Sequence, residues 1–342
     1  MNNQKEYVCV SGFSASGSSA VVDLLKEFDG FFECSAEIRI IQDPYGITQL
    51  ERALIDDWNE ISSSIAINDF LWLCKKCAKV GGGRNPFAPS GLSYSKKICK
   101  DFYNLSVKYI ESLSSFSYKS DYYCQKFKKS YIKYVFDRIL LGIQLKSKGK
   151  IRLFNVKKKS YFSHPSIDEF ERETKKFFNN VFQQNFYAGY RRIILDQAIS
   201  VNKPDSVFRY FDNGKLIIVD RDPRDMFIDD IVNWGNSFDS DLDSIDAGKR
   251  FVLRHKAMRS NYLDNPNILY INFEELVLNY EETVTKILKF LGADNEEHIN
   301  KFKYFNPNVS KKNIGIWKKY YNEYKEAIDY IYLELKSYCV ED

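Results

Sequence analysis

Hydrophobic and polar positions near the N-terminus follow the order of a strand, a loop and a helix. Residues 7–13 (YVCVSGF) form a short apolar run, which is typical of a buried strand. The small residues at 14–19 (SASGSS) predict a loop, and residues 20–28 (AVVDLLKEF) repeat apolar side chains at helical spacing. This order predicts the first strand, loop and helix of an α/β fold.

Two later segments repeat the strand pattern. Residues 216–219 are apolar and an Asp-Arg-Asp-Pro turn follows them directly, so we expect a helix from near Arg224. Residues 267–277 (NILYINFEELV) predict another strand, and the residues after it predict a helix that ends at Gly292. Strands that alternate with helices predict a parallel sheet with helices on both faces.

The chain between these segments is largely helical in pattern. Residues 61–145 are rich in Tyr, Phe, Lys and Ser, with helical repeats interrupted by the loop GGGRNPFAPSG at 81–91. The other expected elements are an extended segment at 33–46, a helix at 50–58, a strand at 151–155 and a helix over 168–200. We therefore expect one α/β domain over residues 1–342, with a helical insertion at about 61–150.

The composition indicates a globular protein and excludes a disordered tail or a small disulfide scaffold. Of the 342 residues, 44% are hydrophobic and 28% are charged, which is enough to bury a sizeable core. The net charge of +4, from 50 Lys and Arg against 46 Asp and Glu, is too balanced for a general nucleic-acid binder. An anion site in this chain must therefore be local.

The sequence carries neither a secretory signal pattern nor a run of about 18 apolar residues, so we expect no membrane span. The seven Cys predict reduced thiols in a cytosol-like compartment. The Cys74 and Cys77 pair lies in an amphipathic helical segment, which favours two part-buried thiols over zinc or redox chemistry. The three His are far apart in the sequence, so we expect no metal site.

Residues 12–19 have the spacing of a phosphate-binding loop, with Gly12 and Gly17 separated by four residues. The two glycines permit positive φ angles, and the N–H groups of residues 16–19 would then converge on an anion at the helix N-terminus. Ser18 stands where a loop of an ATP- or GTP-hydrolysing enzyme has Lys, so the charge clamp of that chemistry is missing. A plain turn of small residues is the alternative.

This order of elements, with Ser in place of that Lys, resembles the sulfotransferases that use 3′-phosphoadenosine 5′-phosphosulfate (PAPS). The loop at 14–19 is similar to the family's PKSGTT or PRSGTS loop, and residues 221–225 (RDPRD) match its RNPKD motif. The resemblance implies that Arg221 binds the 3′-phosphate of the nucleotide. It also implies a P-loop-like sheet, and 5′-phosphosulfate contacts from Ser14, Ser16, Gly17, Ser18 and Ser19.

Two motifs near the C-terminus extend the resemblance. Residues 272–276 (NFEEL), followed by residues 290–292 (FLG), look like the family's YEDL and FLG pair. Residues 310–318 (SKKNIGIWK) are similar to its RKG-x-x-G-x-W-K loop, which implies donor contacts from Lys311, Lys312 and Trp317. Each motif also has a plain structural explanation: a solvated turn, a helix cap, and a packed aromatic beside surface lysines. The resemblance does not cover the insertion at 61–150.

The sequence departs from the family at two donor positions. Ala15 stands where the family usually has a Lys or Arg that stabilises the leaving oxygen, and Arg39 or Lys318 is our candidate replacement. Asp229 stands where the family usually has a Ser that joins Arg221 on the 3′-phosphate, and its carboxylate would repel that phosphate. One explanation is that Arg224, or Lys311 together with Lys312, offsets this repulsion. The other is that the donor carries no 3′-phosphate.

The reaction needs a general base for the acceptor hydroxyl, and the family uses His or Glu. We expect Glu37 to be that base, with Asp43 and His164 as reserves. The alternative for Glu37 is a structural ion pair with Arg39.

The resemblance implies an enzyme that moves a sulfuryl group from PAPS to a hydroxyl, releases 3′,5′-adenosine bisphosphate (PAP) and needs no metal. The Tyr, Phe and Lys residues of the insertion are where we expect acceptor recognition, and a carbohydrate such as a surface-polysaccharide unit is favoured over a phenol, a lipid or a peptide tyrosine. Arg84 either reaches an acidic acceptor or caps a turn. We expect a bacterial cytoplasmic enzyme without a nucleic-acid partner. The alternatives are a phosphoryl-transferring P-loop enzyme and a nucleotide-binding relative without turnover.

Overall fold

The computed structural model describes residues 5–34, 36–81, 91–120, 122, 130–148, 150, 159–183, 189–233, 243–293 and 296–341. Five parallel strands form its central sheet, in the order β2-β5-β1-β6-β7. They are β1 (Glu6–Gly12), β2 (Phe31–Glu33), β5 (Arg192–Asp196), β6 (Gly214–Asp220) and β7 (Ile268–Asn272). In the register of this sheet, Val8 of β1 lies opposite Ile194 on one side and Lys215 on the other. The predicted parallel α/β sheet is confirmed.

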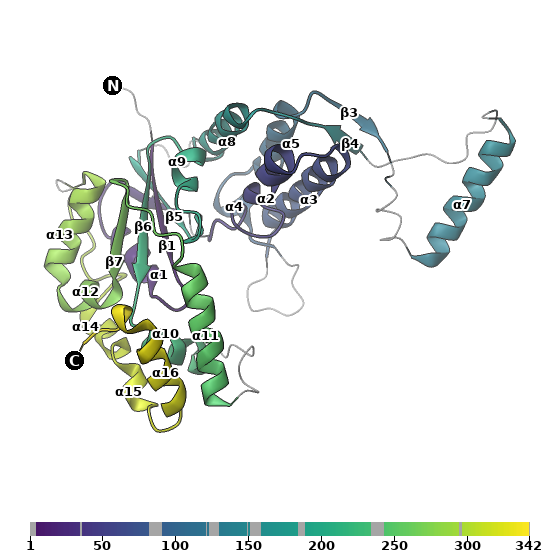
Figure 1. The fold of residues 1–342 in the computed structure, drawn as a ribbon. Helices are drawn as coiled ribbons and strands as arrows, with labels where there is room; N and C mark the ends of the chain where they lie inside the picture. The colour runs from purple at the N-terminus through teal and green to yellow at the C-terminus, as the bar shows by residue number, and fades with distance from the viewer. Residues whose placement is uncertain are drawn as a thin grey trace.

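Alternate residues of the strands enter two separate cores, one on each face of the sheet. Val8 and Val10 pack with α1 (Ser18–Leu25), α12 (Phe273–Leu278) and α13 (Tyr280–Leu291). Tyr7 and Cys9 enter the other core because successive side chains of a strand point to opposite faces. The helices that contribute to this second core include α8 (Ile167–Phe182), α9 (Ser206–Tyr210), α10 (Pro223–Val232), α11 (Ser244–Met258) and α16 (Lys325–Leu335). Figure 1 shows helices on both sides of the sheet.

The segment between β2 and β5 is mainly helical and also contains a small antiparallel sheet of β3 (Phe116–Lys119) and β4 (Lys159–Phe162). Its helices are α2 (Ile47–Glu51), a π-helix (Arg52–Asp56), α3 (Glu60–Ala78), α4 (Tyr94–Lys97), α5 (Phe102–Ser112), α7 (Tyr131–Lys146) and α8. Cys74 and Cys77 are buried on α3 as free thiols. After β7, the C-terminal part adds α12, α13, α14 (Pro307–Ser310), a 3-10 turn (Lys311–Asn313), α15 (Ile316–Lys319), α16 and a second 3-10 turn (Lys336–Tyr338).

Several boundaries follow local sequence signals. Helix α10 begins at Pro223, whose fixed φ suits a first helical position, and the Asp222 side chain accepts from the N–H of Arg224 at 2.8 Å. Gly292 ends α13 in the left-handed conformation, as predicted. The predicted strand at 267–277 ends earlier, because residues from Phe273 onward form α12. The strand expected at 151–155 and most of the loop at 81–91, including Arg84, lie outside the described residues.

The helix expected over 168–200 is wrong in its second half. Helix α8 ends at Phe182, and residues 192–196 (RIILD) form β5, an interior strand that pairs with β1 on one side and β2 on the other. A short apolar run that is buried on both faces does not alternate, so its periodicity does not separate a strand from a helix. This correction changes the site, because the carboxyl end of β5 faces the predicted phosphate loop.

Candidate active site

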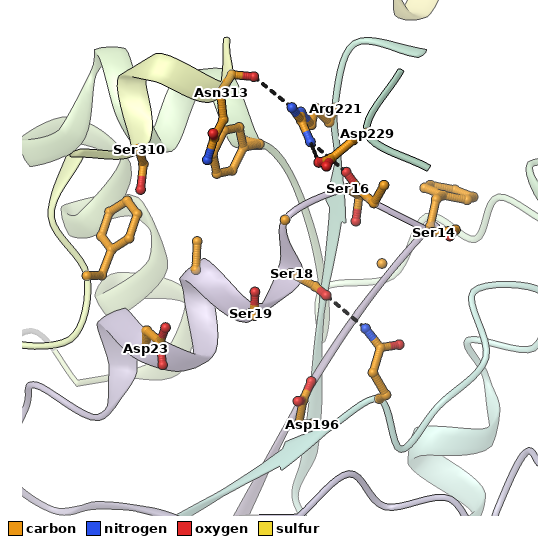
Figure 2. A pocket seen from close by; sticks show the side chains of 18 of the residues that line it. Ser14, Ser16, Ser18, Ser19, Asp23, Asp196, Arg221, Asp229, Ser310 and Asn313 are labelled. Atoms are coloured by element: carbon orange, nitrogen blue, oxygen red, sulfur yellow. Dashed lines mark hydrogen bonds and ion pairs between the residues drawn. The ribbon is translucent and has the colours of Figure 1, made fainter. Parts of the chain in front are cut away.

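A cavity of about 1150 Å³ opens at the carboxyl ends of β1, β5 and β6. The loop between β1 and α1 forms one wall, and residues 302–306 with Ser310 and Asn313 form another (Figure 2). Parallel strands of an α/β sheet typically bind ligands at this edge, outside their carboxyl ends. The position fits the donor site that the sequence predicts.

Glycine is required twice in the loop. A Cβ at Gly12 would lie 2.2 Å from Ser16 Oγ and 2.9 Å from the carbonyl oxygen of Val219. Gly17 has a φ of +79° and precedes the first residue of α1, and a Cβ there would lie 2.6 Å from the Phe273 ring. The loop therefore closes against β6 and α12 because neither glycine has a side chain.

The hydroxyl groups of the loop differ in their partners. Ser16 Oγ is buried and has no hydrogen-bond partner among the described residues. The N–H of Ser16 donates to the carbonyl of Phe13 at 3.0 Å, so it does not join the N–H groups that we expected to face an anion. Ser18 Oγ accepts from Gln197 Nε2 at 2.8 Å, Ser14 Oγ donates to Asp230 at 2.8 Å, and Ser19 is exposed (Figure 2).

Two observations indicate that the loop is suited to the phosphosulfate end of the expected donor. The hydroxyl of Ser16 is an orphaned polar group, and a buried polar group of this kind costs free energy until a ligand or water pairs with it. The N-terminus of α1 has no side-chain cap, so its first N–H groups are available to an anion.

Arg221 lies at the end of β6 and is buried by contacts within the chain. Its Nη1 donates to Asp229 Oδ2 at 2.6 Å and to the carbonyl of Ala15 at 2.9 Å, and its Nη2 donates to the carbonyl of Asn313 at 2.6 Å. The guanidinium also lies over the Phe273 ring, 5.3 Å from its centroid. Arg221 thus lines the cavity with its charge already paired with Asp229 (Figure 2).

The charged residues that line the cavity are more acidic than basic. The acidic side chains are those of Asp23, Glu37, Asp196, Asp229 and Asp230, and the basic ones are those of Arg39, Arg221 and Lys303. An anionic ligand in this cavity would therefore have to be held by backbone N–H groups and hydroxyls more than by cationic side chains.

The wall at residues 302–306 is fixed by Glu27, which is fully buried. Its carboxylate accepts from the N–H groups of Phe302, Tyr304 and Phe305 at 3.0, 2.7 and 2.9 Å. His298 Nε2 lies 2.8 Å from the same carboxylate. Burial opposes the charged form, but the hydrogen bonds from His298 and the three N–H groups lower the pKa of Glu27. A single carboxylate therefore holds this wall against the end of α1.

Asp196 and Gln197 are cavity residues that the sequence analysis missed. They directly follow the apolar run of β5, and the run was interpreted as part of a helix. Burial raises the pKa of Asp196 to about 6, and the carboxylates of Glu37, Glu33 and Asp23 add to the effect. One oxygen of Asp196 is buried without a hydrogen-bond partner among the described residues. A strand interpretation of 192–196 would have placed this carboxylate at the site.

Glu37 and Arg39 both line the cavity, as the proposed roles require. Glu37 also lies 3.2 Å from Arg39 Nη1, which is the ion pair that was the alternative for this residue. Arg39 Nη2 lies 2.7 Å from Asp43, so this reserve base is engaged by the same guanidinium. The other reserve, His164, packs on the Trp58 ring at 4.4 Å and does not line the cavity.

The C-terminal motif contributes to the cavity through different residues from those expected. Ser310 and Asn313 line it, whereas Lys311 and Lys312 are exposed on the 3-10 turn and do not. Trp317 lines a separate cavity of about 530 Å³, where its ring lies 4.2 Å from the Arg224 guanidinium.

Arg224 does not face Arg221. Its Nη2 donates to Asp222 at 2.6 Å and to the carbonyl of Val340 at 2.8 Å. Arg224 was one candidate to offset the negative charge of Asp229 at the 3′-phosphate. Its contacts in this structure do not support that role.

Direct hydrogen bonds join the motifs that the sequence singled out. Glu274 accepts from the N–H of Asp222 at 3.0 Å, and burial raises the pKa of Glu274 to about 7. Asp225 accepts from the N–H groups of Gly315 and Trp317 at 2.7 and 3.0 Å. The charged turn after β6 thus fixes both the start of α12 and the C-terminal loop.

No group of three or more His, Cys, Asp or Glu within the described ranges is arranged to hold a metal ion. In the same ranges, none of the helices has the length and apolar character needed to cross a lipid bilayer.

Residues 140–297 match the sequence model of the sulfotransferase family. No curated protein sequence matches the chain. Among solved structures, a sulfotransferase from Alicyclobacillus acidocaldarius is 10% identical, with 96% of this chain and 95% of that chain covered and a TM-score of 0.36. The sulfotransferase domain of the Synechococcus PCC 7002 olefin synthase is 12% identical, with 100% and 98% covered and a TM-score of 0.40. Retinol dehydratase, in complex with androsterone and the inactive cofactor PAP, is 16% identical over 45% of this chain and 56% of that chain, with a TM-score of 0.26.

Proposed function

We propose that this protein is an enzyme of the sulfotransferase family, that its donor is PAPS and that its acceptor is a carbohydrate hydroxyl. The observation that carries the donor assignment is the loop at 12–19, with an orphaned buried hydroxyl at Ser16 and an uncapped helix N-terminus behind it. Backbone N–H groups and hydroxyls of this kind suit a phosphosulfate, because they bind the oxygens of an anion without a metal.

We propose that the residues of the loop hold the 5′ end of the donor and that Arg221 faces its 3′-phosphate. PAPS supplies an activated sulfuryl group when it is bound. The N–H groups at the start of α1 stabilise negative charge on the phosphate oxygens as that group departs. Arg39 lines the same cavity and is our candidate for the cation that Ala15 does not provide; Lys318 is the second candidate.

We keep Glu37 as the proposed general base and add Asp196 as a second candidate. Both carboxylates line the cavity, and a pKa of about 6 suits Asp196 to accept a proton near neutral pH. Glu37 is exposed and paired with Arg39. Asp196 is the last residue of β5 and precedes Gln197, whose side chain bonds to Ser18.

We prefer a carbohydrate acceptor because two exposed aromatic side chains, Tyr45 and Trp72, come after Arg39 in the sequence and contact each other. The rings of Tyr45 and Trp72 meet edge to face at 5.8 Å, and both side chains are exposed. Aromatic faces bind the apolar faces of sugars by packing. We further propose that the whole chain acts as one domain in the bacterial cytoplasm, with the helical segment at about 61–150 on the acceptor side.

A second candidate function is nucleotide binding without turnover. The observation that favours it is the Arg221–Asp229 pair at 2.6 Å, together with Ala15 in the place of the family's cation. This candidate predicts nucleotide affinity and no sulfated product from any acceptor.

The first test is calorimetric binding of PAP without metal, compared with ATP and Mg²⁺. We expect PAP to bind more tightly, and Ser19→Asp to weaken that binding at least tenfold, because a carboxylate would stand at the exposed start of α1. Ser62→Asp is the matched control, since it adds the same charge to an exposed position in the first turn of α3.

Preference for ATP with Mg²⁺ would instead support phosphoryl transfer. Arg221→Ala in the same assay tests the 3′-phosphate contact, with the thermal unfolding midpoint as its check on folding.

A further inference from the structure

Helix α7 presents an apolar stripe to solvent. Ile132, Phe136 and Ile139 recur at helical spacing and are 82%, 59% and 55% exposed, and Ile143 continues the row. No residue of α7 is buried. Figure 1 shows the helix standing apart from the other labelled elements. Apolar side chains gathered on one helix face usually mark a contact surface. Single exposed apolar residues scattered over a surface would not recur at helical spacing.

The same part of the sequence concentrates positive charge. Residues 126–159 contain 12 Lys and Arg and one Asp, a net charge of +11. All other residues contain 38 basic and 45 acidic side chains, a net charge of −7. The near-neutral total therefore conceals a strongly basic segment centred on α7. Within the described residues, Lys133, Lys146, Lys148 and Lys150 are exposed.

We propose that α7 is an interfacial anchor that binds the surface of an anionic lipid bilayer. Its apolar stripe would enter the boundary between headgroups and acyl chains, while its lysines would reach the anionic headgroups. With 16 residues, α7 is about 24 Å long, and its charged residues at 133, 137, 138 and 146 suit a helix that lies along the interface.

Charge favours a bilayer over a second copy of this chain as the occupant. Two α7 helices packed through their apolar stripes would bring two basic segments close together, and their like charges would repel each other. An anionic bilayer satisfies the stripe and the lysines at once. This proposal does not depend on the identity of the donor or the acceptor.

The test is cosedimentation of the full-length protein with vesicles. We expect binding to vesicles of equal parts phosphatidylglycerol and phosphatidylcholine, and at least tenfold weaker binding to phosphatidylcholine alone or at high salt. The double variant Phe136→Asp with Ile139→Asp should lose at least tenfold in affinity for the anionic vesicles, because it places two carboxylates in the stripe. Leu253→Asp with Leu333→Asp is the matched control: these leucines of α11 and α16 are 69% and 72% exposed, and their loss should not change vesicle binding.

An unchanged thermal unfolding midpoint in both variants would show that folding is intact. Absence of wild-type binding to anionic vesicles, or equal binding by the α7 variant, would overturn the proposal. A concentration-dependent dimer that the α7 variant abolishes, without vesicle binding by the wild type, would assign the stripe to a second copy and also overturn it.

Discussion

Asp229 sets the charge that Arg221 can offer to a ligand. The two side chains form an ion pair at 2.6 Å, and the guanidinium has further partners in the carbonyls of Ala15 and Asn313. A 3′-phosphate would have to compete with the carboxylate for the same N–H donors. Asp229, which replaces the family's usual Ser, therefore contacts Arg221 directly. This contact should lower the affinity for a donor with a 3′-phosphate.

We expect Asp229→Asn to raise the affinity for PAP roughly tenfold, because a neutral amide leaves the guanidinium charge to the phosphate. Calorimetric titration of PAP measures the change. Asp23→Asn is the matched control: it removes one negative charge from the same cavity but has no contact with Arg221. Equal gains in both variants would mean that total cavity charge, and not the ion pair, limits binding. A loss in Asp229→Asn would contradict the role of Arg221.

The two candidate bases are separable by kinetics. The variant that removes the true base should lower kcat by about 10²-fold or more with little change in PAP affinity. If Asp196 is the base, kcat/KM of the wild type should rise as the pH increases through about 6 and then level off, because the carboxylate must be ionised to accept a proton.

Glu37→Gln and Asp196→Asn are measured side by side, each with a pH profile. An unchanged rate in one variant eliminates that residue. Unchanged rates in both would place the base elsewhere.

At the scale of elements, the site depends on the close approach of the loop to β6 and α12. Gly12 packs where a Cβ would meet both the Ser16 hydroxyl and the Val219 carbonyl, so the loop, the strand and the helix start are fixed together. The charged turn after β6 then ties α12 and the C-terminal loop to the same strand end through Asp222 and Asp225. The cavity is thus built by the loop, β6, α12 and the C-terminal loop, which meet at the carboxyl ends of the strands.

We expect Gly12→Ala to destabilise the fold by about 1–3 kcal/mol and to lower PAP affinity at least tenfold, because the backbone carbonyl of Val219 cannot move away without disturbing β6. Chemical denaturation and calorimetry report the two effects. Gly142→Ala on α7 is the control, since the added Cβ has no atom within 4 Å apart from its chain neighbours and the helix's own backbone. Wild-type stability in Gly12→Ala would show that the loop relaxes more easily than its packing suggests.

At the scale of the whole molecule, the proposed donor and acceptor surfaces come from different parts of the chain. The cavity is built by the strand ends and the C-terminal loop, whereas Tyr45 and Trp72 belong to the segment between β2 and β5. The charge is divided in a similar way, with a net charge of +11 in residues 126–159 and −7 in the rest of the chain. If the proposed roles hold, donor binding, acceptor choice and bilayer attachment can each be changed without altering the other two.

We expect Trp72→Ala to raise KM for oligosaccharide acceptors roughly three- to tenfold while PAP affinity stays the same, because only acceptor packing is lost. Initial-rate measurements with oligosaccharides and with a phenol acceptor separate the classes. Tyr262→Ala is the control, since it removes another exposed ring, which stacks on the half-buried Tyr270 at 4.6 Å. A higher KM for the phenol alone would contradict a carbohydrate acceptor.

The sequence determined the parts of the fold that depend on local signals. The apolar run at 7–13, the glycine spacing at 12 and 17, and the charged turn at 220–223 predicted the first strand, the loop and the start of α10, because backbone permissiveness and short-range periodicity are local properties. Their order along the chain was enough to predict a parallel sheet.

Only the tertiary structure decided which side chains meet. It made an interior strand of residues 192–196, because burial on both faces, and not periodicity, distinguishes such a strand. In doing so it brought Asp196 to the cavity, whereas Lys311, Lys312 and Trp317 lie outside the lining despite their places in the motif. The Arg221–Asp229 pair joins residues eight positions apart, and its further bonds to Ala15 and Asn313 span most of the chain. Such contacts follow from the packing of distant elements, which residue types and spacing do not specify.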